Sequence, residues 1–213
     1  MIKVIIFDFD GVIVESLDIK TNAFAKLFEQ EGEDIVNRVI NYHLNNGGIS
    51  RYDKFRYIYR EILKRPLNSD KFKKLCNGFA DFVVDGVIAV PYVKGAREFL
   101  ENYASKYKCF VASATPQREI EEIIRKRNIA QFFIKIYGAP TKKNDAVKDT
   151  LIKEDIAPDE AVYIGDAMSD YIAARDNSVN FIARINKNES IFINTNCLKI
   201  KDLMNLNSII ETL

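Results

Sequence analysis

Short apolar runs, rich in β-branched and aromatic residues, recur along the chain and predict β-strands. Five such runs stand out, at residues 2–7, 109–113, 132–137, 161–164 and 179–182. The runs are nearly continuous in hydrophobicity, which is typical of parallel strands covered on both faces. Amphipathic segments that predict helices lie at residues 95–107, 117–128, 143–154 and 169–176. The pattern therefore predicts an α/β fold with a doubly wound, Rossmann-like parallel sheet.

The long interval between the first and second predicted strands has a different pattern. Residues 16 to about 87 show helical periodicity and no convincing strand. Inside this interval, Ser50 followed by Asp53 matches a capping box, which predicts the start of a helix. We expect a helical cap domain at residues 16–87, inserted into an α/β core domain made of residues 1–15 and 88–213.

Composition and charge narrow the class of protein. The chain has 213 residues, and its 47% apolar content is too high for a disordered protein. A net charge of +1 removes the usual electrostatic reason to expect nucleic acid or an acidic membrane surface as a partner. No apolar run approaches the ~20 residues that a membrane helix needs, and three widely separated cysteines indicate neither a disulfide framework nor a zinc site. We therefore expect a cytoplasmic protein with no nucleic-acid or membrane partner, while the oligomeric state stays open.

Polar residues follow four of the predicted strands, at the edge where open α/β sheets bind their ligands. In strand order they are Asp8 and Asp10, Ser113, the pair Lys142 and Lys143, and Asp166 with Asp170. Four carboxylates at one edge would raise one another's pKa, which implies that a cation lies between them. Oxygen ligands without His or Cys favour Mg²⁺, which commonly also binds substrate phosphate. The pattern therefore predicts a Mg²⁺ site for a phosphorylated ligand.

These residue types suit phosphoryl transfer. A carboxylate such as Asp8 can attack phosphorus and form an aspartyl-phosphate, which splits one displacement into two easier ones. Asp10 can protonate the leaving oxygen and then deprotonate the water that hydrolyses the intermediate. The hydroxyl of Ser113 and a lysine ammonium can bind the phosphoryl oxygens and offset their charge.

The motifs, taken in this order, resemble those of the haloacid dehalogenase superfamily. The matching stretches are Asp8-Phe9-Asp10-Gly11-Val12, Ser113 after an apolar strand, a lysine after Gly-x-Pro, and Gly165-Asp166 with Asp170 four positions beyond Asp166. They span residues 8–170, about three quarters of the chain. The insertion at residues 16–87 corresponds to the helical cap that this superfamily carries at its first insertion position.

The resemblance implies a role for each matching residue. Asp8 would be the nucleophile and Asp10 the acid and base, while Ser113 and Lys143 would bind the phosphoryl group. The metal ligands would be Asp8, the carbonyl of Asp10, and Asp166, with Asp170 binding directly or through water. Similar Gly-x-Pro-x-x-Lys sequences favour Lys143 over Lys142, which we expect to be exposed at the start of a helix.

Other residues have weaker signals. We assign Ala114, beside Ser113, to the phosphate-binding set, and Arg51 to a cap loop that can meet an anionic leaving group. The other interpretation of Arg51, which we favour from the sequence, is a solvated arginine at a helix start. Thr115, before a proline, is expected to be a helix N-cap, and His43 has no evident partner and is taken as incidental.

The second aspartate of the first motif, Asp10, decides between branches of the superfamily, because it favours phosphate-ester hydrolysis or phosphomutase chemistry. We expect a Mg²⁺-dependent phosphatase that hydrolyses a small phosphorylated metabolite. A phosphomutase of the β-phosphoglucomutase type is the main alternative. A phosphoaspartate signalling module, similar to receiver domains, is less well supported, because receivers are shorter and lack a large insertion.

Overall fold

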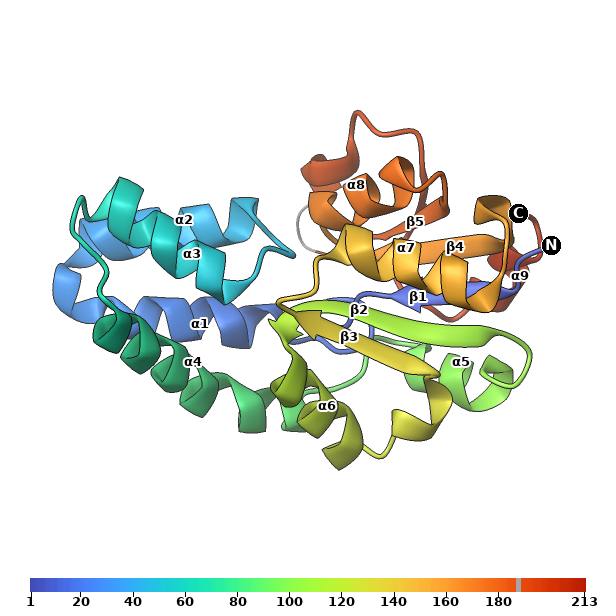
Figure 1. The fold of residues 1–213 in the computed structure, drawn as a ribbon, viewed down its shortest axis with the longest axis horizontal. Coiled ribbons are helices and arrows are strands. Elements are labelled where there is room, and N and C mark those ends of the chain that lie inside the picture. The colour runs from blue at the N-terminus through green and yellow to red at the C-terminus, as the bar shows by residue number, and fades with distance from the viewer. Residues whose placement is uncertain (187–188) are drawn as a thin grey trace.

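In the residues that the structure describes, 1–186 and 189–213, six parallel strands form one sheet. This computed structural model gives the strands as β1 (Val4–Phe7), β2 (Lys108–Pro116), β3 (Lys135–Ala139), β4 (Ala161–Gly165), β5 (Asn180–Arg184) and β6 (Leu198–Ile200). Their order across the sheet is β3-β2-β1-β4-β5-β6, so the chain leaves the central strand β1 in both directions (Figure 1). The doubly wound α/β fold predicted from the sequence is confirmed. Residues 187–188 of the predicted core segment lie outside the described residues.

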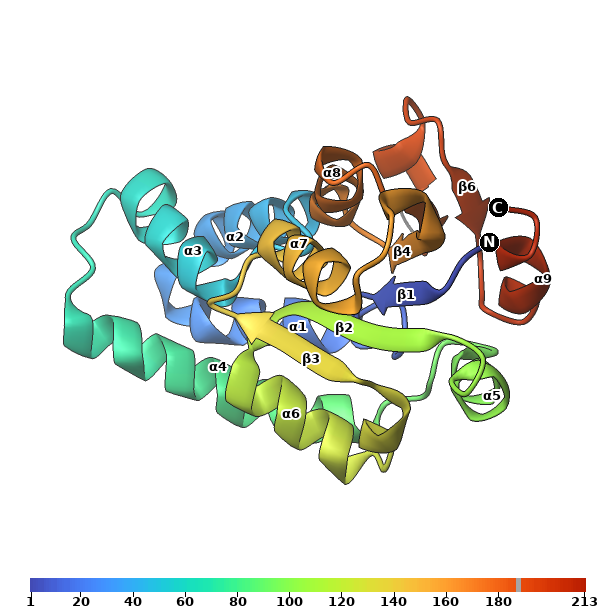
Figure 2. The ribbon, with the colours of Figure 1, turned by 45° about the vertical axis from the view of Figure 1, so that its right-hand side comes forward.

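Both faces of the sheet are covered, because alternate side chains of each strand point to opposite faces. In β1, Ile5 and Phe7 pack into one hydrophobic cluster, and Val4 and Ile6 pack into another. The first cluster lies under α5 (Ala96–Tyr103), α6 (Gln117–Lys126) and α9 (Leu206–Ile210); the second lies under α7 (Lys143–Glu154) and α8 (Met168–Asp176). Figures 1 and 2 show α7 and α8 on the face opposite α5 and α6.

The interval between β1 and β2 is helical, as predicted. It contains α1 (Leu17–Leu27), α2 (Glu33–Asn45), α3 (Arg51–Tyr57) with a π-helical turn at Ile58–Ile62, and α4 (Ser69–Ala89). These helices lie beyond the carboxyl end of β1 (Figure 1). They enclose a cluster of aromatic rings in which Phe24 lies 4.8 Å from Phe79 and 5.6 Å from Phe55, centroid to centroid. We call α1 to α4 the cap; its limits at residues 16 and 87 stay a prediction.

Short 3₁₀ turns complete the fold, at Glu29–Glu31, Ala130–Phe132, Pro158–Glu160 and Glu189–Phe192. One of them explains why β3 begins later than predicted, since residues 130–132 form a helical turn and not the start of the strand. The short edge strand β6 was not predicted, because three residues are too few to show a period of two.

The expectation that Thr115 is a helix N-cap is wrong. Strand β2 continues through Pro116, which pairs with Ala139 of β3, and α6 begins only at Gln117. The residue at the N-cap of α6 is therefore Pro116, and it forms no side-chain capping bond. Thr115 stays in the strand and its hydroxyl donates to Asp10 Oδ2 at 3.1 Å.

A buried arginine of the core binds the end of the cap's last helix. Arg127 follows α6, and its Nη1 donates to the carbonyl oxygens of Val87, Ile88 and Val90 at 2.9, 2.6 and 2.9 Å. Its guanidinium also lies 4.1 Å from the centroid of the Tyr92 ring. The last carbonyls of a helix have no partner within the helix, so Arg127 satisfies groups that would otherwise be buried without one.

We expect Arg127→Met to lower the free energy of unfolding by roughly 3 kcal/mol, because several buried carbonyls lose a charged donor. The matched control is Arg125→Met, which removes an exposed arginine from the last turn of the same helix and should change stability by less than about 0.5 kcal/mol. Urea denaturation followed by circular dichroism measures both. Equal losses in the two variants would contradict this role of Arg127.

Candidate active site

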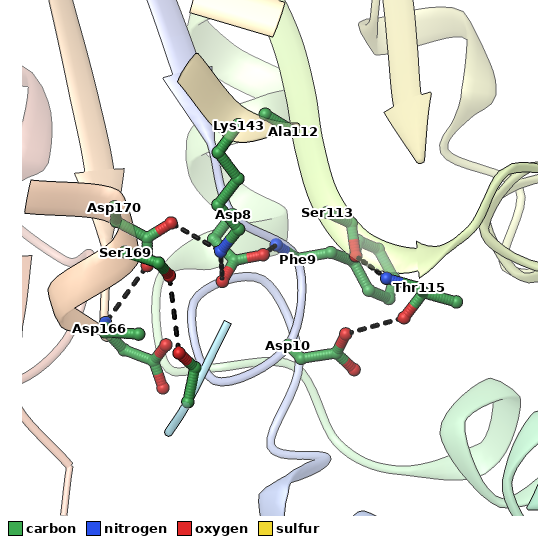
Figure 3. Close-up of polar contacts among 12 residues, drawn as sticks. Asp8, Phe9, Asp10, Ala112, Ser113, Thr115, Lys143, Asp166, Ser169 and Asp170 are labelled. Atoms are coloured by element: carbon green, nitrogen blue, oxygen red, sulfur yellow. Dashed lines mark hydrogen bonds and ion pairs between the residues drawn. The ribbon is translucent and has the colours of Figure 1, made fainter. Parts of the chain in front are cut away.

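The structure brings the predicted carboxylates to one edge of the sheet (Figure 3). Asp8 directly follows β1, Asp166 follows β4, and Asp170 lies in the first turn of α8. One carboxylate oxygen from each of these three residues lies within 4.8 Å of the others. Asp10 is not a member of this cluster. Its side chain has a separate set of partners, of which Figure 3 shows Thr115 of β2.

Asp8 is buried and tightly positioned. Its backbone N–H donates to the carbonyl of Ile164 at 2.9 Å, so the neighbouring strand β4 fixes its place. Its Oδ2 accepts from Lys143 Nζ at 2.8 Å and its Oδ1 accepts from the N–H of Phe9 at 2.6 Å. Burial raises the pKa of Asp8 to about 7; Lys143 opposes this shift, while the charges of Asp170 and Asp10 add to it.

Asp166 lies in the same low-dielectric cluster. Burial, followed by the charges of Asp8 and Asp170, raises the pKa of Asp166 well above its ordinary value. Asn186 Nδ2 donates to Asp166 Oδ2 at 3.0 Å. The loop after β1 approaches closely on the other side: a Cβ at Gly11 would lie 2.1 Å from Asp166 Oδ2, and Gly11 has a φ of +76°. Only glycine fits this position without strain.

Asp170 is fully buried and its carboxylate accepts three hydrogen bonds. Lys143 Nζ donates to Oδ1 at 2.5 Å, the Tyr163 hydroxyl donates to Oδ1 at 2.9 Å, and the N–H of Ala167 donates to Oδ2 at 3.0 Å. Asp170 therefore fixes the direction of Lys143 and closes the first turn of α8. Its predicted metal role stays a prediction.

The two neighbouring lysines lie in different places. Lys143 is the first residue of α7, and its buried ammonium bridges Asp8 and Asp170. Lys142 is the exposed N-cap residue of the same helix, as expected. Burial works to lower the pKa of Lys143, but the two carboxylates outweigh it and raise that pKa above its ordinary value.

Asp10 is the centre of a second network, which joins the core to the cap. Ser16 Oγ donates to its Oδ1 at 2.6 Å, and its Oδ2 accepts from Thr115 and forms an ion pair with Lys20. Lys20 also donates to Thr115 Oγ1 at 2.9 Å. Burial works to raise the pKa of Asp10, but the charge and hydrogen bond of Lys20 lower it overall. Sequence reasoning missed Lys20, although it lies one helical turn after Ser16 and therefore on the same side of α1.

A cavity of about 900 Å³ lies between the cap and the edge of the sheet. Asp8, Asp10, Asp166 and Ala114 line it from the core side. Ser113, which is buried and accepts from the N–H of Thr115 at 3.1 Å, lies next to Ala114 behind the lining. The volume suits a small metabolite.

The cap lies against the site through a glycine loop. Ser169 Oγ donates to the carbonyl of Gly47 at 3.4 Å (Figure 3). A Cβ at the next residue, Gly48, would lie 2.0 Å from Ser169 Oγ and 2.9 Å from Lys143 Nζ, and its φ is +71°. A residue with a side chain at position 48 would therefore prevent this close approach.

Arg51 is buried, so the expectation of a solvated arginine at a helix start is wrong. Ser50 caps α3 by accepting from the N–H of Asp53 at 3.3 Å, which confirms the predicted helix start and points Arg51 inward. Arg51 lines the cavity and forms an ion pair with Glu119 of α6, a contact across the two parts of the chain. Its Nε is buried without a hydrogen-bond partner. The predicted contact with substrate stays a prediction.

His43 has a partner that the sequence did not suggest. The side chain is buried and its Nδ1 lies 2.8 Å from Lys54 Nζ, where both residues line the cavity. The two residues are eleven positions apart on different helices, so no local pattern relates them.

Several known proteins resemble this chain. A phosphorylated carbohydrates phosphatase of Thermotoga maritima is 25% identical over 190 residues, which cover 84% of this chain and 83% of that protein. The structure of a β-phosphoglucomutase from Clostridium difficile superposes with a TM-score of 0.80 and 20% identity, covering 99% of this chain and 96% of that one. A predicted phosphoglycolate phosphatase from Haemophilus somnus gives a TM-score of 0.76 and 17% identity, with coverage of 98% and 97%. At these identities the two structures show a shared fold.

Within the described part of the chain, no helix has both the length and the apolar character needed to cross a membrane. The sequence pattern of haloacid dehalogenase-like hydrolases matches residues 5–184, which include every carboxylate of the site. The order of the motifs along the chain, their position after parallel strands and this match agree with one another. The chain belongs to the haloacid dehalogenase-like hydrolase family.

Proposed function

We propose that the protein is a Mg²⁺-dependent phosphatase that hydrolyses a small phosphorylated metabolite through an aspartyl-phosphate on Asp8. The observation that carries this proposal is the buried cluster of Asp8, Asp166 and Asp170 around Lys143, at the end of a cavity. Membership of a hydrolase family supports it and favours an enzyme over a signalling module. The Thermotoga relative, a phosphatase of phosphorylated carbohydrates, supports a sugar phosphate or related metabolite as the substrate class.

The carboxylates fit a hard divalent cation. Asp8 and Asp166 are buried with raised pKa values, so this arrangement favours a shared positive charge between them. The donors are oxygen atoms only, which suits Mg²⁺ better than a softer metal. Asp8, Asp166 and the carbonyl of Asp10 would bind the ion, with Asp170 bound directly or through water. Bound Mg²⁺ offsets the charge of the carboxylates and of the phosphoryl oxygens.

The residues of the site perform two displacements in sequence. In the first, a carboxylate oxygen of Asp8 bonds to phosphorus while the ester oxygen departs and takes a proton from Asp10. In the second, Asp10 accepts a proton from a water that attacks phosphorus, which releases phosphate and restores Asp8. Asp10 must enter the first step protonated, and an incoming phosphate dianion raises its pKa by like-charge repulsion. Lys143, Ser113 and the backbone at Ala114 bind the phosphoryl oxygens.

A phosphomutase would use the same residues, and the structural likeness to β-phosphoglucomutase favours it as the second candidate. The two reactions differ in the acceptor, which is water for a phosphatase and a sugar hydroxyl for a mutase. Accumulation of a sugar bisphosphate during turnover of a sugar monophosphate would support the mutase, and release of inorganic phosphate would support the phosphatase.

A cytoplasmic location, without nucleic-acid or membrane partners, is part of the proposal and rests on composition and charge.

Asp8→Asn should lower phosphate release from p-nitrophenyl phosphate by about 1,000-fold or more, because an amide cannot replace the attacking carboxylate. Asp145→Asn, which removes an exposed carboxylate from the first turn of α7, is the matched control and should stay within about twofold of wild type. A colorimetric assay with Mg²⁺ measures both. Turnover by Asp8→Asn near the wild-type rate would exclude Asp8 as the nucleophile.

Lys143→Met should lower kcat by about 100-fold, because the phosphoryl oxygens and Asp8 lose their buried cation. Lys142→Met changes the adjacent, exposed lysine and should leave kcat within about twofold. Steady-state kinetics on the same substrate separate the two. A larger loss for Lys142→Met would show that the phosphate-binding lysine has been assigned to the wrong position.

Mg²⁺ should raise the melting temperature of the wild-type protein by several degrees, because an ion that binds only the folded state stabilises it. Asp166→Asn should lose most of this shift, and Asp145→Asn should retain it. Differential scanning calorimetry with Mg²⁺ and with EDTA measures the shift without any turnover. A shift of the same size in Asp166→Asn would place the ion elsewhere.

A further inference from the structure

The cap side of the cavity carries a buried cation with no anionic partner. Lys54 lies in α3 with 3% of its surface exposed. Its Nζ lies 2.8 Å from His43 Nδ1 and 3.3 Å from the carbonyl oxygen of His43. Within the described residues it forms no ion pair and no third hydrogen bond, so one of its three N–H groups has no acceptor.

Lys54 differs in this from its neighbours around the cavity. Three other cations of the lining each pair with a carboxylate: Lys20 with Asp10, Arg51 with Glu119, and Arg184 with Glu15. A buried charge is ordinarily compensated by such a partner. Lys201 also lines the cavity but is exposed to water, so it needs no such partner. Among the cations of the lining that are shielded from water, Lys54 is therefore the one that no carboxylate of the described residues pairs with.

His43 directs Lys54 without neutralising it. Burial, together with the charges of Lys54 and Lys20, lowers the pKa of His43 to about 2, so the imidazole is uncharged at neutral pH. The contact at Nδ1 assigns this nitrogen as the acceptor and leaves Nε2 as the protonated nitrogen. The His43 ring is held against Phe24, with 4.6 Å between the ring centroids. The contact with His43 thus fixes the orientation of the Lys54 side chain, and the positive charge of Lys54 can still pair with an anion in the cavity.

The buried position of the Lys54 amine disfavours its charged form. Burial lowers the pKa of Lys54 to about 7, and the charges of Lys20 and Lys143 add to this effect while Asp166 and Asp10 oppose it. A protonated amine with so low a pKa destabilises the folded protein. An anion that enters the cavity would supply the missing partner and reverse this shift.

The cavity lets one small molecule reach both this amine and the reaction centre. Asp8 and Asp10 line it from the sheet edge, whereas Lys54 and His43 line it from the cap helices. We propose that Lys54 and His43 form a binding site for a second anionic group of the substrate, which makes the substrate a phosphate ester that also carries a carboxylate or a second phosphate. This inference rests on the proposed function and narrows its substrate class.

The test measures binding in the Asp8→Asn background, where turnover does not interfere, by isothermal titration calorimetry at neutral pH with Mg²⁺. Two matched pairs of compounds isolate the second anion: phosphoglycolate against ethyl phosphate, and glucose 1,6-bisphosphate against glucose 1-phosphate. In each pair the preference is the ratio of the two dissociation constants. The first pair reports on a carboxylate and the second on a second phosphate.

We expect at least one pair to show a preference of about tenfold or more for the member with the second anion. Adding Lys54→Met should reduce that preference to about unity, because methionine fills a similar volume without charge. Lys64→Met, an exposed lysine of the cap that pairs with Glu61, is the matched control and should leave the preference unchanged. The absence of a preference in both pairs, or an equal preference with and without Lys54, overturns the inference.

The pH dependence is a second readout that a purely structural lysine would not move, and it needs no variant at position 54. Lys54 is charged below its lowered pKa and loses its proton as pH rises, so the preference should fade between about pH 7 and about pH 9. The groups that face Lys54 are His43, Lys20, Lys143, Asp10 and Asp166, and their effects are shared by both members of a pair. A preference that stays constant over this range contradicts the assignment.

Failure of this inference is distinguishable from failure of the proposed function. If turnover of p-nitrophenyl phosphate depends on Asp8 but no preference for a second anion is found, only the inference about Lys54 is contradicted. If the preference depends on Lys54 but no phosphate ester is turned over, the proposed anion site is supported and the proposed phosphatase activity is contradicted.

Discussion

Repulsion among buried carboxylates is the constraint on which this site depends. Asp8, Asp166 and Asp170 place oxygens within 4.8 Å of one another, out of water, with the ammonium of Lys143 as the compensating charge that the chain supplies. One lysine cannot balance three carboxylates, and the raised pKa values of Asp8 and Asp166 reflect this imbalance. A divalent cation bound between these carboxylates, as proposed, would offset their charge and that of a phosphoryl group.

The parallel sheet makes this concentration of charge possible. Because β1 and β4 are neighbours in register, their carboxyl ends bring Asp8 and Asp166 together, although 158 positions separate them in the sequence. The start of α7 supplies Lys143 and the first turn of α8 supplies Asp170, and buried hydrogen bonds fix both. The rigid backbone of the sheet resists the separation that the carboxylates would otherwise undergo.

The cap contributes charge of the opposite sign. Lys20, Arg51 and Lys54 reach the cavity from the cap, and two of them pair with carboxylates of the core. These contacts hold the cap against the sheet edge, whereas Lys54 faces the cavity without an anion. Under the proposed function the two walls have different roles: residues of the core wall would carry out the chemistry, and residues of the cap wall would bind the rest of the substrate.

The sequence was most informative about the residues at the carboxyl ends of the strands. The rule that open α/β sheets bind ligands at these ends predicted that Asp8, Asp10, Ser113 and Asp166 lie at one edge of the sheet, and the structure places them there. The family resemblance favoured Lys143 over Lys142, and the structure buries Lys143 against Asp8 and Asp170 and leaves Lys142 exposed. The contacts that the sequence did not predict join the cap to the core or join two helices of the cap. Glu119 pairs with Arg51, 68 positions away, and Lys20 contacts Thr115, 95 positions away, so sequence spacing does not reveal these contacts. His43 and Lys54 are only eleven positions apart, but they lie on different helices whose packing the sequence does not show. Thr115 was misjudged because a Thr-Pro pair is typical of a helix start, whereas pairing with β3 extends the strand there.

Chemical trapping of the intermediate is the most direct test of Asp8 as the nucleophile. Enzyme mixed with substrate and Mg²⁺ is quenched in acid during turnover and treated with borohydride, which reduces an aspartyl-phosphate to homoserine, and peptide mass spectrometry then locates the modified residue. Homoserine at position 8, formed only when substrate and Mg²⁺ are both present, is the predicted result. Homoserine at another aspartate, or none at position 8 under conditions of measured turnover, would contradict covalent catalysis by Asp8.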